Sequence, residues 1–333
     1  MLNTNSLRLD MLLLHRTRKI INELLSSFGV AVVRAEKKPW FRWGAVPTQV
    51  GRYSIQVPVI NPISRHYARL PNLMSQLGRL TSLVKMKYPH LTAIDIGANV
   101  GDTACIIKTA VDIPLLCIEG DNYSFSFLEK NIRQFQNTTA HKLFLGEKTE
   151  AITVTFEKNG WNTTIKPDKA GATQKIEVVS LDDFLATQPK VENFKLLKID
   201  TEGFDCAIIR GGGKFIQQVR PVITFEYNRE NMDAIGENGL ETFSMLAGFG
   251  YSHAAFHDAN GRFLFSIKTA DHSFIRDLHE YADGPNGSIY YYDITVFSEA
   301  DSDIASMFVE QERSFRRQGK QVSNQAGSTT KIE

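Results

Sequence analysis

Short apolar runs, each followed by polar or glycine-rich sequence, recur through the middle of the chain. Two of them, Phe194–Asp200 and Val222–Tyr227, are nearly continuous, which is the pattern of strands buried on both faces of a sheet. Segments with room for one helix separate the runs, so the pattern predicts a doubly wound α/β fold. The other predicted strands of this sheet are Ala93–Ile96, Pro114–Glu119 and His141–Leu145.

The pattern changes on either side of this core. Residues 1–45 are predicted to be a helical extension, Gln49–Ile60 alternates like an edge strand, and Ser64–Met86 repeats leucine at helical spacing. Residues 46–300 are predicted to form the main domain, and residues 301–333 a polar helix with a disordered tail. Later elements are expected as two β segments within 151–180, a helix capped by Ser180, and antiparallel strands at Tyr251–Phe256, Phe263–Ile267 and Ile289–Phe297.

The stretch Ala93–Thr103, AIDIGANVGDT, predicts a strand, a tight turn and the start of a helix. Gly97 and Gly101 leave no side chain between the backbone and a ligand. Their G-x-x-x-G spacing differs from the G-x-G-x-x-G of dinucleotide-binding turns. A purely structural turn is the alternative interpretation.

The next strand ends in Glu119, about 20 residues past the glycines. A carboxylate at this place suits the two hydroxyls of a ribose. The alternative is a solvated loop carboxylate.

Acidic residues concentrate at the predicted strand ends, where ligands bind in a doubly wound sheet. The fourth strand ends in LLKIDTEGFD, with Asp200 and Glu202, and the fifth in TFEYN, with Glu226 and Asn228. Asp200, Glu226 and Asn228 form a candidate all-oxygen site for Mg²⁺. Alternatively one of the acids, Asp200, Glu202 or Glu226, is a general base, or the acids only stabilise a helix N-terminus.

Composition narrows the function classes. The 333 residues carry a formal net charge of +1, which gives no indication of nucleic-acid binding. Three scattered cysteines without metal-ligand spacing suggest reduced thiols and a cytoplasmic protein. No apolar run is long enough for a membrane span, and Leu7–Val33 can form basic amphipathic helix that lies on a membrane, on a partner subunit or on its own domain.

The motifs IDIGANVGDT, CIEGD, SLDDFL, LLKIDTEGFD and ITFEYN, in this order, resemble the FkbM-type S-adenosylmethionine-dependent methyltransferases. The resemblance covers roughly residues 90–230. It implies the class I methyltransferase fold, a seven-stranded mostly parallel sheet with a reversed hairpin at its end. It also implies methyl transfer to a hydroxyl of a sugar, polysaccharide or polyketide-like acceptor.

Carried over to this sequence, the resemblance implies that the turn from Gly97 to Gly101 holds the methionine part of S-adenosylmethionine and that Glu119 holds its ribose. The Gly146–Glu147 region would lie near the adenine, and Asp200 would face the methyl group. The complete expected cofactor set is Asp95, Gly97, Asn99, Gly101, Asp102, Glu119, Gly146 and Asp200.

Other functions and contacts stay open from the sequence. A nicotinamide-dependent oxidoreductase and a non-catalytic, membrane-peripheral scaffold with a vestigial fold are the competing hypotheses; the missing G-x-G-x-x-G disfavours the first and the intact acids disfavour the second. Trp161 and Asn162, in a polar insertion, are expected to face the acceptor, because a tryptophan stacks on sugar rings. The acceptor itself and the oligomeric state are not readable from the sequence.

Overall fold

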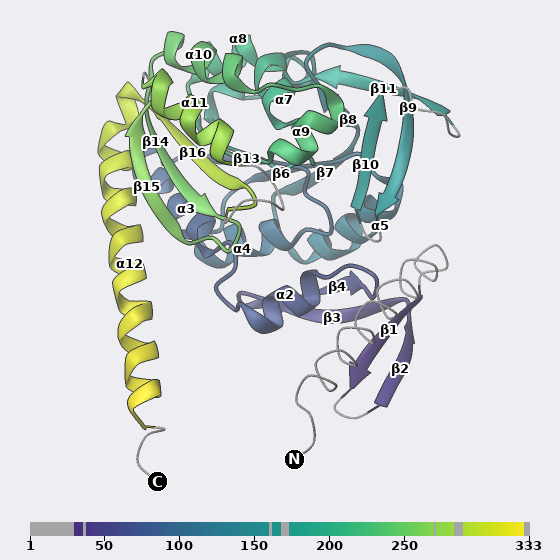
Figure 1. The fold of residues 1–333 in the computed structure, drawn as a ribbon. Coiled ribbons are helices and arrows are strands. Elements are labelled where there is room, and N and C mark those ends of the chain that lie inside the picture. Colours follow the sequence, from purple (N-terminus) through teal and green to yellow (C-terminus); the bar gives the residue numbers. More distant parts are fainter. Residues whose placement is uncertain are drawn as a thin grey trace.

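A computed structural model describes residues 30–35, 38–159, 162–167, 173–269, 271–282 and 289–329 of the chain (Figure 1). Its centre is an eight-stranded sheet in the order β15-β14-β16-β13-β12-β5-β6-β7. The strands are β5 (Thr92–Ile96), β6 (Leu115–Glu119), β7 (Thr138–Lys142), β12 (Phe194–Ile199), β13 (Val222–Tyr227), β14 (Tyr251–Asp258), β15 (Phe263–Lys268) and β16 (Tyr292–Ser298).

The strand order confirms the predicted class I methyltransferase fold. β7, β6, β5, β12 and β13 pair in parallel, and β16 enters antiparallel between β13 and β14. These seven strands have the expected order with the reversed hairpin at the end. An eighth strand, β15, extends the sheet beyond β14.

Two hydrophobic clusters cover the two faces of the sheet, because alternate residues of each strand point to opposite sides. On β5, Ile94 belongs to one cluster and Ala93 to the other. One face carries α3 (Ser75–Lys87), α4 (Asp102–Ala110), α5 (Asn122–Asn131) and the first half of α12 (Ser302–Thr329). The other carries α6 (Leu181–Leu185), α7 (Asp205–Gly211), α8 (Gly213–Val219), α9 (Arg229–Ile235), α10 (Leu240–Gly248) and α11 (His272–Tyr281).

A second, four-stranded sheet has the order β10-β9-β11-β8. Its strands are β8 (Phe144–Gly146), β9 (Glu150–Asn159), β10 (Asn162–Pro167) and β11 (Thr173–Ser180). The single strand expected over His141–Leu145 is therefore wrong. The chain leaves the central sheet after Lys142, and β8 pairs in parallel with β11 instead. Ser180 caps α6 as predicted, since its side chain accepts a hydrogen bond from the Asp183 amide.

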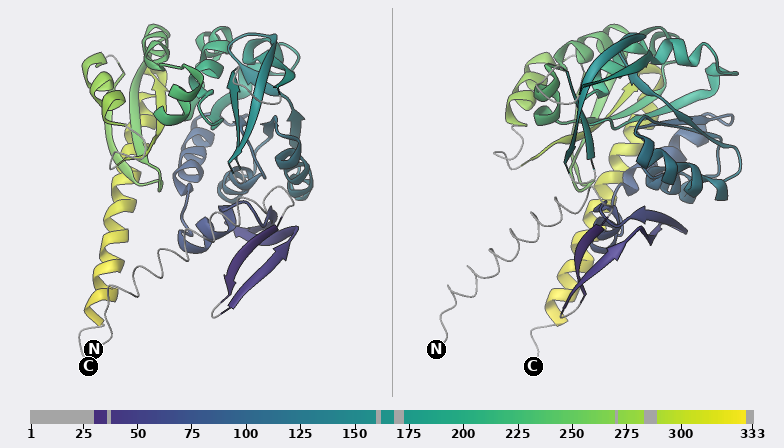
Figure 2. Two further views of the ribbon diagram at one scale, coloured as in Figure 1. Left: turned by 45° about the vertical axis from the view of Figure 1, so that its right-hand side comes forward. Right: turned by 90° about the vertical axis from the view of Figure 1, so that its right-hand side faces the viewer.

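The N-terminal part departs from the expected helix and edge strand. Val30–Ala35 and Lys38–Trp43 form a hairpin, β1–β2, because valine-rich and aromatic sequence favours strands. A second hairpin joins β3 (Ala45–Val50) to β4 (Tyr53–Pro58), where one strand was expected. Figure 2 shows both hairpins below the central sheet. Residues 1–29, which include most of the predicted amphipathic segment, lie outside the described residues.

The helix predicted over Ser64–Met86 is two helices, α2 (Ile63–Arg69) and α3. The break follows from Pro71, because the residue before a proline is disfavoured in helical conformation. At the other end, α12 continues to Thr329, into the last dozen residues, which were predicted to be a disordered tail. The short 3-10 turns are η1 (Ile132–Gln134), η2 (Val191–Asn193) and η4 (Glu299–Asp301).

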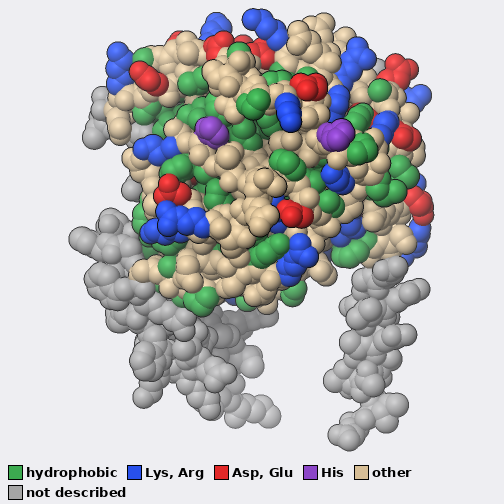
Figure 3. All heavy atoms as spheres, turned by 180° about the vertical axis from the view of Figure 1, so that it is seen from behind, with side chains coloured by type: hydrophobic (Ala, Val, Ile, Leu, Met, Phe, Trp, Pro, Cys, Tyr) green, Lys and Arg blue, Asp and Glu red, His purple; other side chains and the backbone are tan. Residues whose placement is uncertain are grey.

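The surface carries charges of both signs, in agreement with the small net charge of the chain. Seen from behind, the molecule shows acidic and basic side chains interspersed over one face (Figure 3). Among the described residues, no helix combines the length and the apolar character that crossing a bilayer requires.

Candidate functional site

The predicted strand ends meet at one edge of the central sheet. Ile96 pairs with Ile118 on one side and Ile199 on the other, and Ile199 pairs with Phe225. The Asp200 amide donates to the Ile96 carbonyl at 3.0 Å, which ties the end of β12 to that of β5. Parallel strands in register thus bring the glycine turn, Glu119, Asp200 and Glu226 to the same edge.

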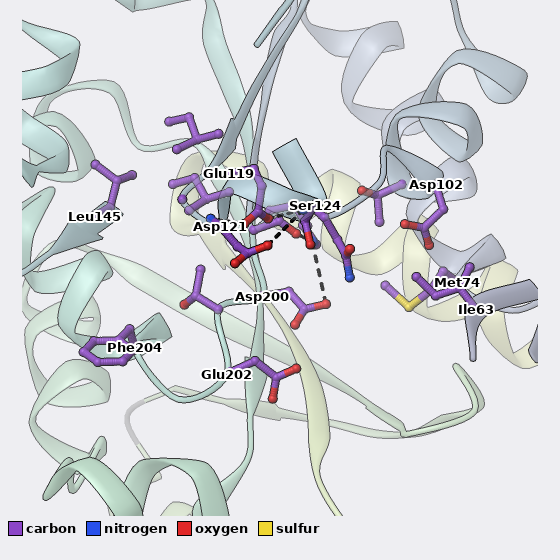
Figure 4. A pocket seen from close by; sticks show the side chains of 18 of the residues that line it. Ile63, Met74, Asp102, Glu119, Asp121, Ser124, Leu145, Asp200, Glu202 and Phe204 are labelled. Carbon is purple, nitrogen blue, oxygen red and sulfur yellow. Dashed lines mark hydrogen bonds and ion pairs between the residues drawn. The ribbon is translucent and has the colours of Figure 1, made fainter. Parts of the chain in front are cut away.

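A cavity of about 470 Å³ opens at this edge. In Figure 4, Asp200 lies in its middle, Leu145 and Phe204 lie on one side, and Ile63 and Met74 lie on the other. The volume is in the range of small-molecule sites. Six of the predicted residues line the cavity: Gly97, Asn99, Asp102, Glu119, Asp200 and Glu202.

The glycine turn is as tight as its sequence predicts, but its glycines are required by packing within the protein and not only by the approach of a ligand. Gly97 and Gly101 have φ of 72° and 89°, in the left-handed region that favours glycine. A Cβ atom on Gly97 would overlap the carbonyl oxygen of Asp200, so Gly97 is needed for the contact between two strand ends. A Cβ atom on Gly101 would lie 3.2 Å from Leu128 of α5, and Gly101 caps α4. Packing thus accounts for both glycines.

Glu119 fastens the glycine turn to the end of β6. One carboxylate oxygen accepts a hydrogen bond from the Asn99 amide at 2.9 Å, and the other accepts one from the Asp121 amide at 2.8 Å. Burial raises the pKa of Glu119 to about 7. A carboxylate oxygen can accept two hydrogen bonds, so both oxygens retain a lone pair for ribose hydroxyls.

Asp102 begins α4 and lines the cavity beside this turn. The Tyr67 hydroxyl of α2 donates to its Oδ2 at 3.0 Å. Burial raises the pKa of Asp102 to about 6. As the acid in the first turn of α4, it interacts favourably with the positive end of the helix dipole.

Asp95 has no direct part in the cavity wall. Its side chain is fully buried, accepts a hydrogen bond from Thr103 and forms an ion pair with Lys198 at 3.1 Å. Asp95, which was expected to contact the cofactor, instead holds Thr103 and Lys198 beneath the glycine turn. Lys198 was not predicted; the signal was a lysine inside the apolar run LLKID, where a charge needs a partner.

Gly146 and Glu147, expected near the adenine, are not among the residues that line the cavity. A Cβ atom on Gly146 would meet Val178 of β11 at 2.6 Å, so the glycine serves packing in the second sheet. Glu147 forms an ion pair with Arg210 at 2.8 Å. The residues just before Gly146 line the cavity instead: Leu143, Phe144 and Leu145. The apolar run was visible in the sequence, but its residues were assigned to a strand of the central sheet.

Asp200 and Glu202 line the cavity on the β12 side. The Asp200 side chain is 39% exposed and its Oδ2 lies 3.7 Å from Lys198 Nζ. Glu202 has a left-handed backbone, with φ of 55°, and accepts a hydrogen bond from Asn231 at 2.7 Å. Burial, together with the charges of Asp200 and Asp205, raises the pKa of Glu202 to about 7.

Glu226 belongs to the same acidic group. Burial, and then the charges of Asp200, Glu202 and Asp205, raise the pKa of Glu226 well above its ordinary value. Asp205 is the acid in the first turn of α7, and its side chain also accepts hydrogen bonds from the Thr201 amide and hydroxyl at 3.2 and 3.0 Å. The helix-terminus alternative therefore describes Asp205, and Asp200 stays turned to the cavity.

The structure does not assemble the expected magnesium ligands. Within the described residues, no group of three or more histidine, cysteine, aspartate or glutamate side chains is arranged to hold a metal ion. The Asn228 side-chain oxygen accepts a hydrogen bond from the Asn231 amide at 3.3 Å and caps α9.

The prediction that Trp161 and Asn162 face the acceptor is not tested by the structure. Trp161 lies outside the described residues, and Asn162 is the first residue of β10, with a side chain that is not described either.

Comparison with known proteins gives the family. The family model of the methyltransferase FkbM domain matches residues 95–253. This segment of the chain is an FkbM methyltransferase domain. It contains the glycine turn, Glu119, Asp200, Glu202 and Glu226, while α2, α3 and the strands β14 to β16 lie wholly or mostly outside it. No curated protein matches the chain in sequence.

Solved structures similar to this chain include other methyltransferases. An FkbM methyltransferase from Methylobacillus flagellatus has 17% identity over 50% of this chain and 39% of its own, with a TM-score of 0.36. The match thus spans well under half of that protein. A putative transferase from Pyrococcus horikoshii has 11% identity, 86% coverage of each chain and a TM-score of 0.41. A putative O-methyltransferase from Klebsiella pneumoniae has 10% identity, 73% and 90% coverage and a TM-score of 0.37.

Around the FkbM domain, the cavity wall includes residues that the motifs do not contain. Five come from α2 and the segment after it, and others come from the β14–β15 turn and the start of β16. No periodic or glycine-rich signal marks these positions, because they reach the site only through the packing of distant elements. The lining residues from α2 and the segment after it are Ile63, His66, Leu70, Leu73 and Met74, and Tyr291 lines the cavity just before β16.

Proposed function

We propose that this chain is an S-adenosylmethionine-dependent O-methyltransferase that acts on a hydroxyl of a sugar, polysaccharide or polyketide-like acceptor. One observation carries the proposal. The glycine turn, which is bound to Glu119, and the two acids after β12, Asp200 and Glu202, line the same cavity. Nucleoside recognition and proton removal are the two tasks that this transfer needs, and the two groups supply them side by side.

The residues present fit the cofactor. Leu143, Phe144 and Leu145 offer an apolar wall for the adenine, and Glu119 offers its free lone pairs to the ribose. Asn99 contributes a buried side-chain oxygen that has no hydrogen-bond partner among the described residues. An acceptor atom left unpaired in the turn suits a donor from the methionine end, because a buried polar group is otherwise costly.

The chain's own contribution to the chemistry is alignment and proton removal. S-adenosylmethionine supplies an activated methyl group when bound. Asp200 takes the proton of the acceptor hydroxyl, so the oxygen lone pair forms the new carbon–oxygen bond while the carbon–sulfur bond breaks and leaves its electron pair on sulfur. Glu202, with a pKa raised to about 7, and Glu226 beside it can share the proton that Asp200 gains.

We also place the activity in the cytoplasm, with a small-molecule or glycan acceptor and without nucleic acid. Support for the compartment comes from Cys105, Cys117 and Cys206, which are buried free thiols. Contact of the Leu7–Val33 segment with a membrane stays a separate prediction.

Calorimetry on the purified chain tests the cofactor proposal. S-adenosylmethionine and S-adenosylhomocysteine should bind with micromolar affinity, while NADH, as the control nucleotide, should give no heat. Transfer of a labelled methyl group to a panel of hydroxyl compounds then tests the reaction. Binding of NADH together with silence of both S-adenosyl ligands would favour the oxidoreductase hypothesis and overturn the proposal.

A further inference from the structure

One wall of the cavity is apolar and comes from residues 63–74, which lie outside the matched domain. This segment contributes five lining residues, of which Ile63, Leu70, Leu73 and Met74 are apolar and His66 is the polar one. In Figure 4, Ile63 and Met74 lie across Asp200 from Leu145 and Phe204. If the adenosine lies beside Leu145, this wall faces the acceptor, which lies beyond the reacting methyl group.

The apolar wall is held in a fixed shape. Ile63, Leu73 and Met74 pack against the buried core beneath the helices. Met74 has a left-handed backbone, with φ of 57°, which costs a residue other than glycine about 1–2 kcal/mol. The Gln76 side-chain amide donates to its sulfur at 3.6 Å. A strained backbone and an anchored thioether at a cavity indicate a surface that the fold preserves.

The part of the cavity around Asp200 and Glu202 disfavours an acceptor with a negative charge. Asp102, Glu119, Asp121, Asp200 and Glu202 all line it, and Lys198 is already paired with two of the neighbouring acids. Burial, and then the charges of Arg65 and Arg69, lower the pKa of His66, which disfavours its charged form. An anionic group of the acceptor beside Asp200 and Glu202 would therefore meet repulsion.

We propose that the acceptor is a neutral alcohol with an aliphatic body, whose hydroxyl faces Asp200 while its apolar part lies on Ile63, Leu70, Leu73 and Met74. The inference rests on the proposed methyl transfer and narrows its acceptor class. The matched domain supplies the cofactor site and the acids, whereas the segment before it selects the acceptor.

Binding of simple alcohols tests the inference without knowledge of the natural acceptor. The full chain is saturated with S-adenosylhomocysteine and titrated with 1-alkanols from butanol to octanol. Affinity should rise on the order of threefold to fourfold with each added methylene, as expected for burial of a CH₂ group. 8-Hydroxyoctanoate, which has the same chain length and a negative charge, should bind at least about tenfold more weakly than 1-octanol.

A matched pair of methionine variants locates the effect. Met74→Asn keeps a residue that tolerates the left-handed backbone and removes the apolar surface. Met86→Asn makes the same change on α3, where the side chain is 74% exposed. Met74→Asn should weaken 1-octanol binding on the order of tenfold and spare S-adenosylhomocysteine, and Met86→Asn should change neither.

The outcomes separate the two proposals. Absence of S-adenosylhomocysteine binding to the wild-type chain contradicts the proposed function itself. Cofactor binding without any chain-length dependence, or preference for the hydroxy acid, overturns only the acceptor inference. Equal losses of alkanol and S-adenosylhomocysteine affinity in Met74→Asn would show that the wall serves the cofactor, which also overturns it.

Discussion

The side-chain nitrogen of Lys198 lies 3.1 Å from Asp95 Oδ1 and donates to the Gly97 carbonyl at 3.2 Å. Both charged side chains are buried, at 4% and 0% exposure. The same nitrogen lies 3.7 Å from Asp200 Oδ2. One buried cation therefore joins the strand end beneath the glycine turn, the turn itself and the candidate base.

Loss of this cation should destabilise the fold. Lys198→Met leaves Asp95 buried without its counter-charge, which costs about 3–5 kcal/mol for a buried pair. Urea unfolding followed by circular dichroism measures the change. The double variant Asp95→Asn/Lys198→Met should recover part of the loss, because no unpaired charge remains. Equal stability of the single and double variants would contradict this account of the pair.

Removal of the Glu119 carboxylate should weaken cofactor binding. Glu119→Ala removes the proposed ribose contact and the two acceptors for the Asn99 and Asp121 amides. The free energy of cofactor binding should therefore become less favourable by about 1–3 kcal/mol. Calorimetry with S-adenosylhomocysteine measures it. Glu129→Ala, at an exposed glutamate of α5, is the matched control. A global loss of the circular dichroism signal at 25 °C would instead make Glu119 a structural residue.

The raised carboxyl pKa values predict an unusual pH dependence of stability. Glu119, Glu202 and Asp205 each have a pKa raised to about 7, and burial is the largest cause for all three. The folded state therefore binds more protons than the unfolded state between about pH 4.5 and 7. The free energy of unfolding should fall as pH rises through this window, because stability declines wherever the native state holds more protons.

Urea unfolding at pH 5, 6 and 7 measures this decline. Glu202→Gln keeps the size of the side chain and removes the titration, so it should make the decline shallower. Glu129→Gln, again on the exposed face of α5, should leave the slope unchanged. A wild-type stability that increases steadily from pH 5 to 7 would show that these acids are ionised in the folded protein.

Asp200 is the acid on which the proposed chemistry depends. Asp200→Asn should lower kcat by about 10²-fold or more, because an amide cannot accept the proton, while S-adenosylhomocysteine still binds. Asp277→Asn, at an exposed aspartate of α11, is the control. EDTA separates a base from a metal ligand: a wild-type rate that is indifferent to EDTA makes Asp200 the base, and a rate that EDTA abolishes and Mg²⁺ restores makes it a ligand. A fully active Asp200→Asn enzyme would place the base elsewhere.

The sequence predicts the strand ends well because the signal is local. An apolar run with an acid at or next to its end marks the ends of β5, β6, β12 and β13, and parallel pairing then brings Glu119 and Asp200 to one edge. Pro71 also carried a usable signal for the break between α2 and α3. A leucine repeat that continues in phase on both sides of the proline concealed it.

The remaining errors concern contacts between residues far apart in the chain. Lys198 meets Asp95 across two strands, and residues 63–74 reach the cavity only through the packing of α3 on α4. Gly146 was assigned to the cofactor because the chain was expected to stay in the central sheet. No local pattern tells β7 from β8, since the switch between sheets depends on the later pairing with β11.

The contact between Gly97 and the Asp200 carbonyl also limits how such an enzyme can be redesigned. Because no side chain fits between them, the spacing from the glycine turn to Asp200 is set by main-chain atoms in close contact. Substitution at either position cannot widen that gap without parting two neighbouring strands. Acceptor range would therefore have to be changed from residues 63–74, where side chains can be exchanged while the reaction geometry stays as it is.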